Sequence, residues 1–211
     1  MHILIAALIA LQGHPGHAPD SAGASRPMTI IQSLPETEDF YRGPTAELAR
    51  NGVPGRYGSE EWSAVVLTHE VHQHIGIYTL LGAKMAVRAR EILDAPMRAV
   101  SVKSLTGTKQ PLACMIDGLQ VGLGSTLGQN LIEAPAVDQP AVAAEFSYQD
   151  RAVTLRLKPE YEKRIAGHIQ DAIAEHGNLT PAYFKKVEEI SYTVWAEFDR
   201  KIIFEETATD R

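Results

Sequence analysis

A histidine-rich break between two helical segments constrains this chain more than any other feature. The break is His69-Glu70-Val71-His72-Gln73-His74, which places three imidazoles and one carboxylate within six residues. Before it, Ser59 is followed by two acidic residues, which suits a helix start because carboxylates are favoured at the positive end of the helix dipole. After it, apolar residues recur with helical spacing from about residue 77 to residue 93, where Asp94-Ala95-Pro96 ends the pattern. The sequence therefore predicts that these histidines lie at the connection between two helices.

The second of these helices has an apolar stripe and a charged face. The stripe consists of Leu81, Met85, Ala89 and Ile92. Lys84, Arg88 and Glu91 fall on another face, and charged side chains on a helix face usually meet solvent. We therefore expect Lys84 and Arg88 to be exposed.

The rest of the chain contains strands as well as helices. Three segments alternate apolar and polar side chains, as strands with one buried face do: residues 100–105, 141–148 and 152–157. Three further helices are predicted to begin at Pro111, Pro159 and Thr180-Pro181, because proline suits the first turn of a helix. Residues 192–204 fit a helix or a strand equally well.

Composition narrows the class of protein. With 211 residues, of which 45% are hydrophobic and 22% charged, the chain can bury a core without a metal ion to hold the fold together. A net charge of −6 and the lack of a basic run argue against a nucleic-acid partner. The single cysteine, Cys114, excludes an intramolecular disulfide and an iron–sulfur cluster.

The first 27 residues differ in kind from the rest. Residues 3–11 form an apolar run too short to span a bilayer, and Ala22-Gly23-Ala24 resembles the cleavage site of a secretory signal. However, no Lys or Arg precedes the apolar run, and Met28 is an alternative start. Two interpretations of residues 1–27 therefore stay open. An exported, periplasmic protein is favoured if Met1 is the start, and a cytoplasmic one if Met28 is.

A change in composition near residue 59 predicts a domain boundary. Prolines and glycines recur between residues 28 and 58 and indicate a loop-rich N-terminal extension. Residues 59–211 carry the helical and strand-like patterns and are expected to form one folded domain.

The candidate ligand chemistry lies in the histidine break and at Cys114, about forty residues later. Imidazole nitrogen and thiolate sulfur are the ligands that zinc prefers. Asp117 lies three residues after Cys114, so it falls on nearly the same face of a helix. It can orient a ligand, bind the metal itself or act as a general base. The simpler alternatives are a buried apolar role for Cys114 and an ordinary ion pair for Asp117.

Two segments resemble the signature of the FmdE family of formylmethanofuran dehydrogenase proteins. The first is His72-Gln73-His74-Ile75-Gly76, followed by the helical segment Leu81-Gly82-Ala83-Lys84-Met85-Ala86. The second runs from Cys114-Met115-Ile116-Asp117-Gly118-Leu119-Gln120 to Gly124-Ser125-Thr126-Leu127-Gly128. The resemblance extends over roughly residues 60–205 by these motifs and implies an α+β fold, a twisted central sheet packed by helices, and a homodimer.

The resemblance also implies a divalent metal ion, most simply zinc, bound by His72, His74 and Cys114. Related sequences carry cysteines at the positions of Gly76 and Ser125, so only three protein ligands remain here. Three ligands leave one position open for water or a small molecule, and a water there becomes acidic near neutral pH. His69 is expected to be a helix-end residue rather than a ligand.

Further site residues are expected after the cysteine. Asp117 is the candidate catalytic residue. The candidate substrate-binding residues are Gln120, Gly124, Ser125, Thr126 and Gly128. Glycines between 122 and 128 let a backbone approach an anion, although the spacing is not that of a phosphate-binding loop, so a tight turn near the metal is the simpler expectation.

Two functions of different classes remain open. The first is a metalloenzyme that acts on a small polar or one-carbon substrate at an open His/His/Cys site. The second is a non-catalytic accessory or metal-handling protein associated with a larger oxidoreductase. Both predict a small-molecule or metal ligand, no nucleic acid and no membrane span.

Overall fold

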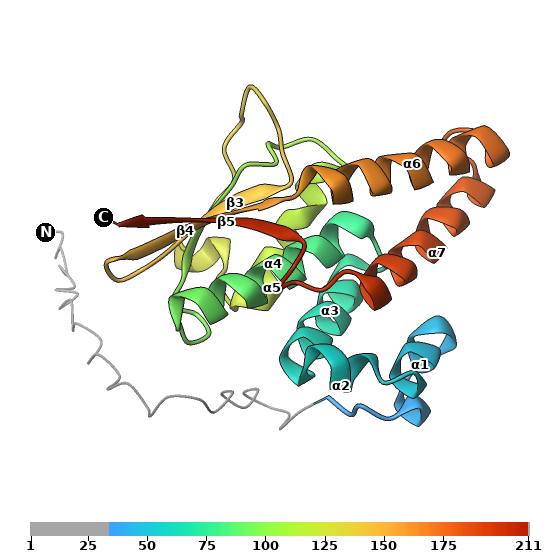
Figure 1. Cartoon of the computed structure of the whole chain (residues 1–211), viewed down its shortest axis with the longest axis horizontal. Coiled ribbons are helices and arrows are strands. Elements are labelled where there is room, and N and C mark those ends of the chain that lie inside the picture. The colour runs from blue at the N-terminus through green and yellow to red at the C-terminus, as the bar shows by residue number, and fades with distance from the viewer. Residues whose placement is uncertain (1–33, 211) are drawn as a thin grey trace, which may run out of the picture.

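The structure, a computed structural model, describes residues 34–210 and combines helices with one five-stranded sheet (Figure 1). The predicted α+β class with a helix-packed sheet is confirmed. The signal-like segment 1–27 lies outside the described residues.

Two short helices precede the histidine-bearing helix, α1 (Gly43–Arg50) and α2 (Val53–Tyr57). The prediction of a loop-rich segment is therefore wrong for this stretch. Each helix has a proline in its first turn, Pro44 and Pro54 respectively. Proline lacks only an N–H that would be unpaired there anyway, so these prolines begin helices instead of preventing them.

The two helices predicted around the histidine break are confirmed as α3 (Ser59–His72) and α4 (Ile77–Leu93). Between them the backbone reverses at Gln73, whose φ of 67° and ψ of 5° lie in the left-handed region. The Gln73 N–H donates to the carbonyl of His69 at 2.8 Å, which closes α3. The connection is thus a capped helix end followed by three residues.

The strands form one mixed sheet in the order β2-β1-β3-β4-β5. Their bounds are β1 Ser101–Ser104, β2 Ile132–Glu133, β3 Ala143–Tyr148, β4 Arg151–Leu157 and β5 Phe204–Asp210. The β1–β2 pair is parallel and the other pairs are antiparallel. In the register of β3 and β4, Phe146 faces Val153 and Ala144 faces Leu155, and all four side chains are buried.

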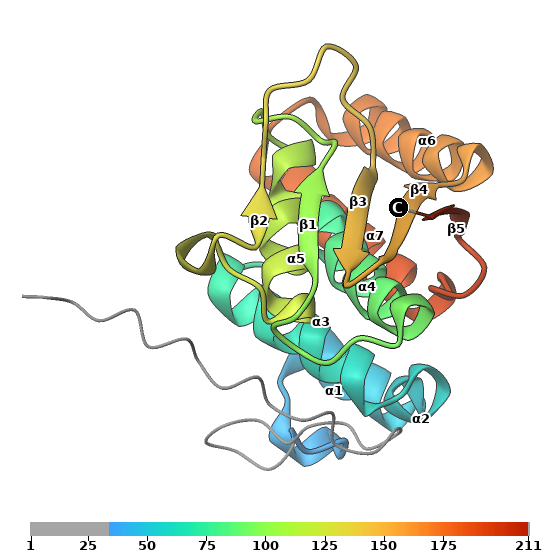
Figure 2. The ribbon, with the colours of Figure 1, turned by 90° about the vertical axis from the view of Figure 1, so that its left-hand side faces the viewer.

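Helices cover one face of the sheet. Figure 2 shows α4 and α5 (Met115–Leu123) behind the strands. Leu80, Leu81 and Met85 of α4 are fully buried, as is Phe146 on the strand side. This helix therefore lies at the centre of the core, and it carries the histidine break at its N-terminal end.

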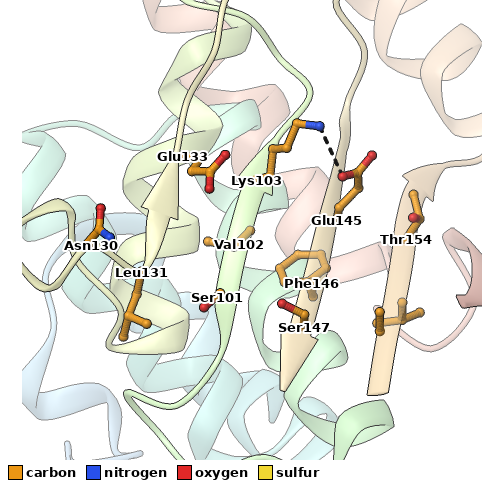
Figure 3. A pocket seen from close by; sticks show the side chains of 12 residues that line it. Ser101, Val102, Lys103, Asn130, Leu131, Glu133, Glu145, Phe146, Ser147 and Thr154 are labelled. Carbon is orange, nitrogen blue, oxygen red and sulfur yellow. Dashed lines mark hydrogen bonds and ion pairs between the residues drawn. The ribbon is translucent and has the colours of Figure 1, made fainter. Parts of the chain in front are cut away.

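The other face of the sheet is polar and hollowed. A hollow of about 540 Å³ lies over β1, β3 and β4 (Figure 3). Across it, Lys103 pairs in register with Glu133 and Glu145, and Lys103 Nζ donates to Glu145 Oε2 at 3.3 Å. Antiparallel sheets commonly leave one face to solvent in this way. None of the predicted metal ligands lines the hollow.

A helical hairpin made of α6 (Pro159–His176) and α7 (Pro181–Glu197) projects from the body of the molecule in Figure 1. Its base is fixed to α3, because the ring of Trp195 stacks on Trp62 with 4.7 Å between centroids. The segment 192–204, which fitted a helix or a strand, finishes α7 and then leads into β5.

Lys84 is fully buried, so the prediction that it is exposed is wrong. Its Nζ donates to Glu61 Oε1 at 2.5 Å, and Glu61 is also fully buried. Arg200 completes the cluster by donating to Glu61 at 3.0 Å and to Glu91 at 2.5 Å. Burial lowers the pKa of Lys84 and the adjacent carboxylate raises it, so the ammonium group depends on Glu61. Arg88 lies outside this cluster and is half-buried.

Helices α4 and α5 cross with their backbones in contact. A Cβ atom built on Gly82 would lie 2.1 Å from the carbonyl oxygen of Met115, and one on Gly118 would lie 2.1 Å from that of Thr79. Only glycine permits this approach. The crossing holds the first turn of α5, with Asp117, against the start of α4.

None of the helices within residues 34–210 combines the length and the apolar character that a bilayer crossing requires.

Candidate functional site

The site is centred on a hydrogen bond between His72 and Asp117. His72 is the last residue of α3, and Asp117 lies in the first turn of α5. His72 Nδ1 is 2.7 Å from Asp117 Oδ2, and the two side chains are 12% and 37% exposed. An ionised carboxylate only accepts, so Nδ1 carries the hydrogen and the Nε2 lone pair is left free. That nitrogen can bind a metal ion or accept a proton.

His74 lies beside His72. The centroids of the two imidazole rings are 4.3 Å apart, with the ring planes inclined by 42°. The sequence predicted an extended loop that points both side chains the same way. Instead, the left-handed residue Gln73 reverses the chain and places the rings together. His74 is exposed, so the pair is open to solvent.

Cys114 ends a short 3-10 helix, η2 (Leu112–Cys114), directly before α5. It lies one helical turn before Asp117, as the sequence predicted, and is half-buried. Burial, and secondly the charge of Asp117, raise the pKa of the Cys114 thiol. The prediction that the helix start favours a thiolate is therefore wrong for the metal-free chain.

The donor types present are those that zinc prefers, but their side chains do not yet converge. Within residues 34–210, no three His, Cys, Asp or Glu side chains are already arranged to hold a metal ion. The structure therefore brings together His72, His74 and Asp117, and leaves Cys114 adjacent rather than joined to them.

His69 is directed away from this pair. Its Nε2 lies 3.0 Å from Thr79 Oγ1, on the third residue of α4. Burial, more than any other cause, lowers the pKa of His69 to about 4, so the ring is neutral near neutral pH. Thr79 was not singled out from the sequence, and a lone threonine in a helix gives no local signal of such a contact.

The glycine-containing loop lies at the other end of α5. Gly124 caps that helix with a φ of 62°, and its nearest neighbours are Met97 and Arg98, which follow the C-terminal end of α4. Seven residues separate Asp117 from Gly124, which is about 10 Å along a helix. The expectation of a turn beside the metal is thus not met.

The hydroxyl groups of this loop serve the loop itself. Ser125 is fully buried, and its Oγ donates to the carbonyl of Val100 at 2.8 Å. Thr126 forms a capping box with Gln129 at the start of η3 (Leu127–Gln129). Ser125 therefore has no free hydroxyl for a ligand. Of the other predicted substrate contacts, Gln120 is half-buried one turn after Asp117, and Gly128 is exposed.

Comparisons with known proteins agree on one family. Residues 71–197 match the family model described as FmdE, molybdenum formylmethanofuran dehydrogenase operon. A crystal structure of an FmdE-like protein of tungsten formylmethanofuran dehydrogenase, from Syntrophus aciditrophicus, is 14% identical in sequence. The similarity covers 72% of each chain, with a TM-score of 0.45. No curated protein matches the chain. Because the family model spans more than half of the sequence, and includes both the histidine pair and Cys114, this chain belongs to the FmdE family.

Proposed function

We propose that this protein binds one zinc-like divalent ion through His72, His74 and Cys114, with a fourth position for an exchangeable ligand. The observation that carries the proposal is the bond between His72 and Asp117. Metal-binding histidines usually donate their other ring N–H to a carboxylate or carbonyl. Such a partner fixes the tautomer and makes the free nitrogen a better ligand.

The positions of the other two ligands support the same site. His74 is exposed and its ring already lies against that of His72, so a solvated ion can reach both. Cys114 lies one turn before Asp117, and rotation of its side chain is the rearrangement that the proposal requires. Loss of the thiol proton accompanies binding, because the thiolate is the ligand form.

The chain's own residues have distinct roles in this proposal. Asp117 holds the proton on His72 Nδ1 and so keeps Nε2 free. The exposed His74 side leaves room for a small polar or one-carbon molecule at the fourth position. A bound divalent ion would supply Lewis acidity there.

A non-catalytic accessory or metal-handling role is the second candidate. It is favoured by one observation: the carboxylate of Asp117 is already engaged by His72, so it is not free to act as a general base. The description of the family refers to the operon of a molybdenum enzyme, which suits a protein that serves a larger oxidoreductase. In either role we expect a homodimer, which light scattering of the purified protein can check.

Metal content of single variants tests the ligand set. We expect Cys114→Ser and His74→Ala to lose most of the metal, because each removes one of three protein ligands. Asp117→Asn should keep the metal but bind it about 10–100-fold more weakly, because the partner of His72 is altered. Elemental analysis and competition with a chelator measure both effects, and His176→Gln on α6 is the control that should match the wild type. Equal metal content in all variants, or none in the wild type, contradicts the proposal.

Cobalt substitution tests the open position. Co²⁺ bound by a thiolate absorbs through sulfur-to-metal charge transfer, so we expect this band in the wild type and not in Cys114→Ser. Addition of formate, the simplest one-carbon carboxylate, should shift the visible spectrum if the fourth ligand exchanges. A spectrum that does not respond to formate, imidazole or pH would instead indicate a closed, structural site.

A further inference from the structure

Three hydrogen bonds tie the end of α3 to the start of α4 on both sides of the histidine turn. The carbonyl of His69 accepts from the Gln73 N–H at 2.8 Å, where the turn begins. The imidazole of the same residue contacts Thr79 Oγ1 at 3.0 Å. The Thr79 hydroxyl in turn donates to the carbonyl of Gly76 at 2.8 Å, where the turn ends. His69 is thus the residue from which both ends of the turn are held.

The direction of the hydrogen bonds identifies the tautomer of His69. A hydroxyl carries one hydrogen, and that of Thr79 is given to Gly76. Nε2 of His69 therefore carries the ring hydrogen and donates it to Thr79 Oγ1. Thr79 is fully buried, so water does not compete for either bond.

The turn held in this way carries His74. A Cβ atom built on Gly76 would lie 3.1 Å from Thr79 Oγ1 and 3.7 Å from His74 Nε2. The ring of His74 therefore lies over the same few atoms that the Thr79 hydroxyl fixes. A change in the conformation of Gly76 would move His74 relative to His72.

His69 is unsuited to be a ligand itself. One ring nitrogen is engaged by Thr79, and the other, Nδ1, is buried without a hydrogen-bond partner within residues 34–210. Its low pKa, near 4, keeps the ring neutral, so it adds no positive charge beside a cation site. A neutral, enclosed imidazole is suited to hold the turn.

We propose that His69 and Thr79 form a clamp of positioning residues that sets the placement of His74 against His72 for metal binding. The inference rests on the proposed function, because it concerns how that site is held. It concerns residues that bind neither metal nor substrate.

Matched variants separate the clamp from a general packing effect. Thr79→Val keeps the shape of the side chain but removes the hydroxyl, whereas Thr79→Ser keeps the hydroxyl. His69→Gln retains an N–H donor near the position of Nε2, whereas His69→Leu does not. We expect the Kd for Co²⁺ to rise about 10-fold in Thr79→Val and His69→Leu, with an altered visible spectrum, and to return to within about 2-fold of wild type in Thr79→Ser and His69→Gln.

The metal-free protein gives an independent readout. In Thr79→Val, but not in Thr79→Ser, the imidazole NMR signals of His74 should shift because its ring is no longer held against His72. Thermal melting in the presence of a chelator identifies any variant that fails to fold. Absence of cobalt binding by the wild type would overturn the proposed function, while the His74 signals would still report on the clamp. Unchanged His74 signals together with an unchanged Kd in folded Thr79→Val and His69→Leu would overturn the clamp.

Discussion

Replacing Glu61 by alanine is expected to lower the free energy of unfolding by about 3–5 kcal/mol. Glu61 is fully buried and accepts hydrogen bonds from both Lys84 and Arg200. Its removal leaves a buried ammonium group without its carboxylate, and the cost of such a charge exceeds the value of the bond that is lost. Urea denaturation of the purified variant measures the effect.

Glu60 provides the matched control for this prediction. It is the preceding residue on α3 and pairs with Arg90 at 2.9 Å, but its side chain is 38% exposed. A partly exposed pair of this kind contributes less than about 1 kcal/mol, so Glu60→Ala should have a small effect. The double variant Glu61→Leu with Lys84→Met should recover most of the loss, because no unpaired charge remains between those positions. Equal losses in Glu60→Ala and Glu61→Ala would contradict a special role for the buried cluster.

Replacing Gly118 by valine is expected to destabilise the fold by more than about 3 kcal/mol, and Gly118→Ala by about 1–3 kcal/mol. The added Cβ would lie 2.1 Å from the carbonyl oxygen of Thr79 and 2.4 Å from the amide nitrogen of Ala83. Both are backbone atoms of α4, so they cannot rotate aside, and the helices have to separate. Because Asp117 is the neighbouring residue, its bond to His72 should lengthen and metal affinity should fall as well.

Gly167 on α6 is the control for the glycine substitution. A Cβ atom built there meets no other atom within 4 Å. Alanine is the better helix former, so Gly167→Ala should raise the free energy of unfolding by about 0.5–1 kcal/mol. Denaturant titration of both variants tests the contrast. A Gly118→Ala protein as stable as wild type would show that the α4–α5 crossing can relax without cost.

Local patterns were sufficient to predict most of the elements of this fold. The helix from Ile77 to Leu93 follows from apolar spacing and the Asp94-Ala95-Pro96 stop, both of which act within a few residues. The strands around Val153 and Leu155 follow in the same way from alternation. Pro44 and Pro54 misled because proline is a signal for a loop and for a helix start alike, and neighbouring packing decides between them.

The errors at the site have a different physical cause, which is contact between segments distant in sequence. Lys84 lies on a charged face by spacing, and only the approach of Glu61 from another helix makes its burial possible. The role of Asp117 was among several alternatives until the crossing of α4 and α5 placed it beside His72. Likewise, the pKa of Cys114 depends on enclosure by the fold, which a helix-start rule does not include.

The buried ion cluster also bears on the rates of folding and unfolding. Arg200 is 139 residues from Glu61 and 109 residues from Glu91, so the cluster closes very long stretches of chain. Contacts between such distant residues cost the most chain entropy and tend to form after local helices and hairpins. Interactions that are absent from the folding transition state slow unfolding and leave the folding rate nearly unchanged. This cluster, which holds the end of α7 against α3 and α4, is therefore suited to prolong the lifetime of the folded chain.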